Sequence, residues 1–200
     1  MVSESHTVLR RAWRTLAVLT IAITATAPAA AQNTEDAWAA LVKGGHVALI
    51  RHATAPAGSG GDPPGVKSDD CLTPRSLTET GRVQAKALGD AFRAHRVRVD
   101  AIYASPWCRC MNTARLTALG RVEGAWTLVP ATSSTPERLS ALKALVSGWR
   151  GPGTLVLITH GLTVQRLLGF VPDQAETVVV EPTPGTGSGV RVVGKIAAPQ

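Results

Sequence analysis

The 200-residue sequence predicts an α/β fold with a largely parallel central sheet. Short apolar runs alternate with longer segments whose apolar residues recur at helical spacing, which is the pattern of strand and helix units. Two of the apolar runs are continuous and carry a histidine at or next to their C-terminal end, HVALIRH at 46–52 and TLVLITHG at 154–161. Ligands bind at the carboxyl edge of such sheets, so both histidines are expected at the binding edge.

Helices and strands are expected to alternate along the chain in an order that can be followed segment by segment. The clearest helix covers 76–95, where Leu88 and Phe92 share the helical period and Ser76 with Glu79 matches a capping box. The expected helices are 34–44, 76–95, 108–120, 136–151 and 161–170. The expected strands are 46–52, 99–106, 126–130, 154–161, 176–182 and 189–196, with a polar Gly/Pro-rich loop at 55–70.

The N-terminal segment, residues 1–31, is predicted to be a secretory signal peptide. Three arginines precede an apolar stretch that is shorter than the roughly 20 residues needed to span a bilayer, and an A-x-A cleavage pattern ends at Ala31. The mature chain, residues 32–200, is then a single domain in the periplasm or outside the cell. An uncleaved anchor is the alternative, and the pair Arg10 and Arg11 leaves the general and twin-arginine export routes open.

The charge of the chain favours a small anionic ligand over a nucleic acid. The formal net charge is +7, but the basic residues form no block and have no interleaved aromatic side chains. We therefore expect no nucleic-acid partner. Because the apolar N-terminal segment is predicted to be removed, we also expect no stable membrane insertion of the mature chain.

Two histidines and two arginines are predicted to meet at the carboxyl edge of the sheet. Arg51 and His52 end one strand, His160 ends another, and the segment SPWCR after a third strand carries Arg109. Groups of this kind are stable together around an anion, and arginine donors match phosphate oxygens in pairs. Because a neutral imidazole is a competent nucleophile toward phosphorus, His52 is the predicted phosphoryl acceptor. The other three side chains would contact the phosphoryl oxygens.

Three short motifs carry these four residues. They are R-H-A at 51–53, S-P-x-x-R-x-x-x-T-A at 105–114 and T-H-G at 159–161. In this order and spacing they resemble the histidine phosphatase superfamily, which has the phosphoglycerate-mutase-like fold. The segment L-T-E-T-G-R at 77–82 resembles the family sequence between the first two motifs, and the resemblance extends over residues 46–181.

The resemblance implies a three-layer α/β/α domain and a phosphohistidine intermediate on His52, with no metal and no other cofactor. It also implies phosphate contacts from Arg51, Arg109 and His160. The protein would then be an exported phosphomonoesterase, a histidine phosphatase that acts on a small phosphorylated substrate. More narrowly, the leader, DDC at 69–71 and the WCRC segment around Arg109 resemble small exported members related to lipopolysaccharide-core heptose phosphatases.

Two departures from the family pattern bear on the reaction. Ala53 replaces the usual glycine, a small change, and 131–136 holds no acid where mutase-type members often carry glutamate, which disfavours mutase activity. The general acid is predicted to be Glu176, which opens the strand after the helix that leaves His160. Glu137 is the competing assignment, although the dipole at a helix start accounts for a glutamate there.

The three cysteines predict one disulfide, because the chain is expected to be exported and their number is odd. Cys71 is expected to pair with Cys108 or Cys110, and either bridge would fix the segment that presents Arg109. Three reduced, buried thiols are the alternative. The cysteines lack the second pair that a structural zinc site requires.

Two other functions compete with a histidine phosphatase. A phosphate- or phospho-sugar-binding protein would keep the anion site without turnover, and the missing glutamate favours it. Cysteine-based phosphatase chemistry is disfavoured, because the segment from Cys110 to Arg115 lacks the glycines of such a phosphate loop and lies in a predicted helix.

Overall fold

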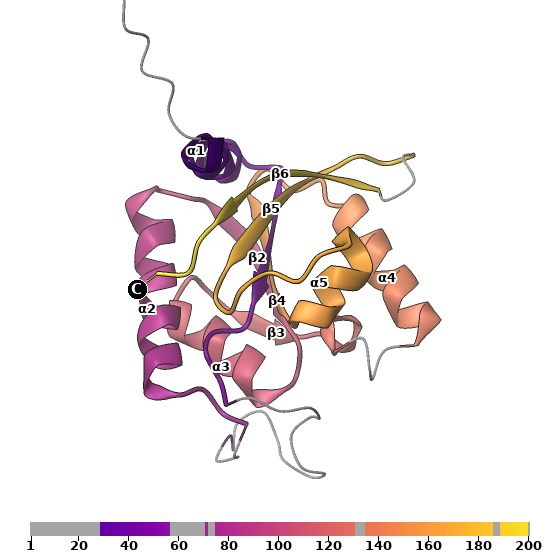
Figure 1. Cartoon of the computed structure of the whole chain (residues 1–200). Helices are drawn as coiled ribbons and strands as arrows, with labels where there is room; N and C mark the ends of the chain where they lie inside the picture. The colour runs from indigo at the N-terminus through magenta and orange to yellow at the C-terminus, as the bar shows by residue number, and fades with distance from the viewer. Residues whose placement is uncertain (1–28, 57–70, 72–74, 131–134, 186–188, 200) are drawn as a thin grey trace, which may run out of the picture.

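A single mixed sheet forms the centre of the molecule (Figure 1). The computed structural model describes residues 29–56, 71, 75–130, 135–185 and 189–199. The sheet order is β3-β2-β4-β1-β5-β6. Its strands are β1 (Val47–Arg51), β2 (Val99–Ala104), β3 (Val122–Gly124), β4 (Thr154–Thr159), β5 (Thr177–Pro182) and β6 (Val190–Ile196). The first four pair in parallel, whereas β5 and β6 join antiparallel, so the predicted α/β fold with a largely parallel sheet is confirmed.

Helices cover both faces of the sheet (Figure 1). One face packs against α1 (Ala29–Lys43), α2 (Glu79–Ala94) and α3 (Cys108–Thr117), and the other against α4 (Pro136–Ser147) and α5 (Gly161–Leu168). Side chains of a strand alternate between faces. In β1, Ala48 and Ile50 enter the first core, while Val47 and Leu49 enter the second. The continuous apolar run of β1 follows from this two-sided burial, and the three layers are confirmed.

Two glycines of α2 allow close backbone contact with the segments that carry the site residues. A Cβ at Gly89 would overlap the carbonyl of Thr117 at the end of α3, and one at Gly81 would overlap the carbonyl of Thr54. Glycine is the only residue that permits such backbone contact. Helix α2 therefore packs directly against α3 and against the chain that leaves β1.

The prediction of a strand at 126–130 is wrong. This segment contains a 3-10 helix, η1 (Trp126–Leu128), and the strand beside β2 is the earlier β3. β3 has only one large apolar side chain, Val122, so its sequence gives a weak strand signal. The apolar residues that suggested a strand, Leu128 and Val129, are buried although they belong to no strand.

The predicted capping box of Ser76 and Glu79 is also wrong. Helix α2 begins at Glu79 and has Thr78 as its N-cap, whose hydroxyl oxygen accepts a hydrogen bond from Gly81 N at 3.0 Å. The Ser76 hydroxyl donates to the carbonyl of Cys71 instead. Serine and threonine both cap helices. Thr78 is the cap here because its hydroxyl also donates to the Thr54 carbonyl at 3.1 Å, a tertiary contact that fixes its position.

Most of the predicted leader and of the predicted 55–70 loop lies outside the described residues. The described chain starts with α1, which begins at Ala29. Within the described residues, no helix combines the length and the apolarity that crossing a membrane requires.

Candidate active site

Three side chains from separate elements meet at the carboxyl edge of the parallel strands. His52 directly follows β1, His160 follows β4 and is the N-cap of α5, and Arg109 lies in the first turn of α3, which follows β2. All three are at least nine-tenths buried. The structure thus brings together three of the four residues that the strand ends predicted.

The guanidinium of Arg109 bridges the two histidines. Its Nε donates to Nε2 of His52 at 3.2 Å, and its Nη2 lies 3.3 Å from Nδ1 of His160. Arginine has donors only, so each of these imidazole nitrogens presents a lone pair. His52 then carries its proton on Nδ1, which donates to the carbonyl of Ala53 at 2.9 Å. The unprotonated Nε2 is therefore the atom of His52 that faces the site.

The opposite tautomer follows for His160. Its Nδ1 faces Arg109, so the proton is on Nε2 and is donated to the hydroxyl oxygen of Ser105 at 2.9 Å. The Cys110 sulfur lies 3.4 Å from the same Nε2. The ring of Trp107 meets the His160 ring edge-on, with centroids 5.1 Å apart.

Both histidines are neutral at physiological pH. The pKa of His52 is lowered to about 3, mainly by burial and in part by the positive charges of Arg109, Arg51 and Arg75, while the hydrogen bond to Ala53 opposes this shift. Burial and the same arginines hold the pKa of His160 well below its ordinary value. A neutral imidazole keeps the lone pair that nucleophilic attack requires.

A hydroxyl links the two motifs that supply Arg109 and His52. The Thr113 hydroxyl accepts from the backbone N of Ala53 at 3.0 Å and donates to the carbonyl of Arg109 at 2.7 Å. Because Thr113 lies one turn after Arg109 on α3, this contact sets the distance between the helix and the end of β1.

Arg51 lies at the edge of this cluster and outside the Arg109 bridge. Its Nη1 donates to the carbonyl of Pro172 at 2.8 Å, and its Nε lies 3.3 Å from the position that a Cβ of Gly161 would take. Burial lowers the pKa of Arg51, and the charge of Asp173 opposes that effect. Within the described residues the buried Nε of Arg51 has no hydrogen-bond partner, and buried donors of this kind are ordinarily paired. An oxygen of a bound anion would supply such a partner.

Neither candidate acid contacts the histidines. The backbone of Glu176 is close to the site, because its carbonyl accepts from Arg51 N at 3.2 Å. Its carboxylate, however, accepts from Asp173 N at 2.7 Å and lies 3.8 Å from Nζ of Lys195. Glu137 is exposed at the start of α4, where a hydrogen bond with the Thr135 side chain lowers its pKa.

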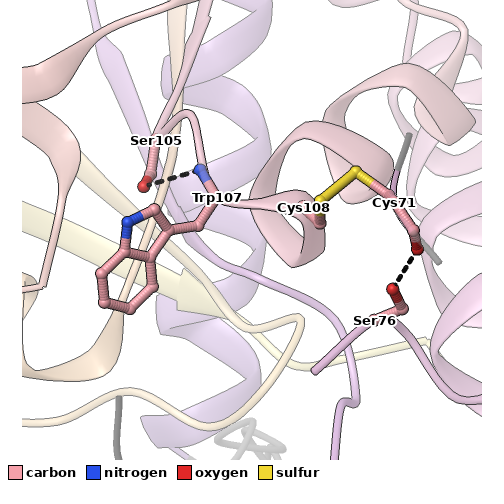
Figure 2. Close-up of a disulfide and its surroundings, with 5 residues drawn as sticks. All are labelled: Cys71, Ser76, Ser105, Trp107 and Cys108. Carbon is pink, nitrogen blue, oxygen red and sulfur yellow. Dashed lines mark hydrogen bonds between the residues drawn. A yellow bond between two sulfur atoms is a disulfide. The ribbon is translucent and has the colours of Figure 1, made fainter. Parts of the chain in front are cut away.

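The predicted disulfide is confirmed and joins Cys71 to Cys108, with their Cα atoms 5.3 Å apart. Cys110 is not part of it and lies buried beside His160. Figure 2 shows the bridge at one side of the α3 start and the Trp107 ring at the other, next to Ser105. The bridge therefore fixes the residue that precedes Arg109.

Four neighbours of the cluster were missed from the sequence. Ser105, Trp107 and Cys110 belong to the same motif as Arg109, so the motif itself was the available signal for them. Arg75 has no such signal, because only the fold brings its charge near both histidines. Among the described residues, no group of three or more potential metal ligands occurs.

A mostly parallel α/β domain that holds two neutral histidines around a buried arginine has the arrangement expected of a phosphoryl-binding protein. The family model for the histidine phosphatase superfamily (branch 1) matches residues 47–128. The matched segment contains the first two of the three motifs that resemble this superfamily, R-H-A at 51–53 and S-P-x-x-R-x-x-x-T-A at 105–114.

Solved structures share the fold at low sequence identity. The protein histidine phosphatase SixA complexed with tungstate is 18% identical, with a TM-score of 0.54, over 76% of this chain and 96% of that one. An α-ribazole-5'-P phosphatase described as putative, from Escherichia coli, is 17% identical, with a TM-score of 0.54, over 74% and 94%. The ecdysone phosphate phosphatase of Bombix mori is 13% identical, with a TM-score of 0.52, over 78% and 93%. A comparison with curated proteins finds no match.

The lowered pKa of His52 predicts a pH-dependent stability. The His52 imidazole binds a proton near pH 6.5 in the unfolded chain but only near pH 3 in the folded one. Unfolding therefore takes up a proton between these pH values, and the free energy of unfolding decreases as the pH is lowered below about 6.5. The expected loss is about 1.4 kcal/mol per pH unit for each such histidine. In urea unfolding measured between neutral pH and about pH 5, the free energy of unfolding of His52→Gln should depend less steeply on pH, by the contribution of one proton. An equal slope in both proteins would contradict the assignment.

Proposed function

We propose that the protein is an exported phosphomonoesterase that acts through a phosphohistidine on Nε2 of His52. The observation that carries this proposal is the unprotonated Nε2, which faces the Arg109 guanidinium at 3.2 Å in a buried site. Attack on a phosphoryl group requires a nucleophile next to a fixed positive charge that stabilises the phosphoryl oxygens.

The reaction has two displacements at phosphorus. In the first, the Nε2 lone pair forms the P–N bond, the P–O bond to the leaving group breaks, and the leaving oxygen takes a proton from the general acid. In the second, water attacks phosphorus, the P–N bond breaks, and the water proton returns to the acid–base residue. Arg109, Arg51 and His160 stabilise the charge on the phosphoryl oxygens, and neutral His52 and inorganic phosphate are left.

Export is supported by the Cys71–Cys108 disulfide, which is typical of an oxidising compartment. The signal peptide over residues 1–31 and the narrower likeness to heptose phosphatases stay predictions from the sequence. A non-catalytic phosphate- or phospho-sugar-binding protein is the second candidate, and the distance of both acids from the histidines favours it. Release of phosphate from an aryl phosphate by the purified protein decides between the two.

The acceptor assignment predicts a phosphorylated His52. Brief incubation with substrate and an alkaline quench should trap acid-labile phosphate on the wild-type protein, and His52→Ala should abolish it and lower kcat by at least about 10³-fold. His95→Ala, an exposed histidine stacked on Trp38, is the matched control and should label normally. A label that survives His52→Ala and disappears in His160→Ala would reverse the assignment.

The acid assignment predicts selectivity for the leaving group. If Glu176 donates the proton, Glu176→Gln should slow hydrolysis of an alkyl phosphate about 10²-fold or more while sparing p-nitrophenyl phosphate, whose leaving group needs no proton. Glu137→Gln serves as the matched variant, and a selective loss there would move the role to Glu137. Equal losses on both substrates would assign Glu176 a structural role.

Export predicts a processed N-terminus. The protein recovered from the periplasm or medium of expressing cells should begin at Gln32, as measured by intact mass and N-terminal sequencing. Recovery of the full-length chain in the membrane fraction would favour an uncleaved anchor instead.

A further inference from the structure

The ring of Trp107 lies against the site without belonging to the core. It is half-buried, and it is a member of none of the three apolar clusters formed by the described residues. Its contacts are instead the His160 ring at 5.1 Å and the Arg109 guanidinium carbon, 4.5 Å from the ring centroid. A tryptophan that packs on two site residues and remains partly exposed presents its open surface at the mouth of that site.

The position of Trp107 is fixed by its neighbours. Its backbone N lies 3.5 Å from the Ser105 hydroxyl oxygen, and the next residue, Cys108, is bridged to Cys71 (Figure 2). The face of the indole is therefore held in place before any ligand arrives. Preorganised surfaces lose little entropy when they bind.

Two exposed apolar side chains follow His160 along the chain. Leu162 and Val171 are 44% and 46% exposed. A Cβ at Gly161 would come within 2.8 Å of Val171 Cγ1, so Val171 lies directly over the residue that follows His160. The buried side chains of His52, Arg109 and His160 thus form a polar floor, and Trp107, with Val171 over Gly161, forms what we call the rim.

We propose that Trp107 binds the leaving group of the substrate and that this group carries an aromatic ring. The inference rests on the proposed phosphomonoesterase function, because the floor must hold the phosphoryl group for the leaving group to reach the rim. Apolar walls with a few polar groups inside are typical of small-molecule sites, and ring pairs gain affinity beyond their buried area. An alkyl group would leave the indole face without a matching surface.

The test compares two anions that are not hydrolysed, phenylphosphonate and methylphosphonate, at alkaline pH, where both are dianions. Isothermal titration with the wild-type protein should give a Kd about tenfold lower for phenylphosphonate. Trp107→Ala should bring the ratio of the two Kd values close to one, and Trp107→Phe should retain part of the preference. Trp126→Ala is the matched control, because Trp126 is an exposed indole on η1, and it should keep the full ratio.

Three results would overturn the inference. The wild-type protein could show no preference, Trp107→Ala could weaken both anions by the same factor, or Trp126→Ala could remove the preference. The second result would make Trp107 a positioning residue for Arg109 only. Because both probes report binding without turnover, a preference in a protein that releases no phosphate would sustain the ring site while the proposed enzymatic function failed.

Discussion

The buried contact of Arg109 with His52 and His160 sets the state of the whole site. A guanidinium in this position tolerates imidazoles only as acceptors, so the two histidines are neutral and each has one defined tautomer. Burial and the arginine charges work in the same direction on both pKa values. The free lone pair on Nε2 of His52 is thus a consequence of burying the imidazole and of packing a permanent cation against it.

The fold supplies this contact through backbone approach and short polar links. Parallel strands deliver the ends of β1, β4 and β2 to one edge, and α3 brings Arg109 over that edge. Thr113 sets the spacing between α3 and Ala53, Ser105 holds the His160 tautomer, and the disulfide anchors the start of α3. Each of these groups acts on a main-chain segment or a proton position, so the precision of the site is distributed over residues that need not touch a substrate.

The sequence predicted the floor of this site and missed what surrounds it. His52, His160 and Arg109 were predictable because the carboxyl ends of parallel strands converge, and Cys71 because an exported chain with an odd number of cysteines suggests one bridge. The choice of Cys108 over Cys110, the cap at Thr78 and the placement of β3 depend on tertiary contacts that no local pattern contains. Glu176 shows the same limit, since its backbone lies beside Arg51 while its carboxylate turns to Asp173 N.

The need to protonate the leaving group links the identity of the general acid to the proposed aromatic leaving group. His52 gives its only proton to the Ala53 carbonyl, and His160 gives its proton to Ser105, so neither histidine is placed to protonate a departing oxygen. The carboxylate of Glu176 is held by Asp173 N and lies near Lys195. Aryl oxygens leave without protonation far more readily than alkyl oxygens. This arrangement gives the proposed aromatic leaving group a chemical argument that is independent of the contact surface of Trp107.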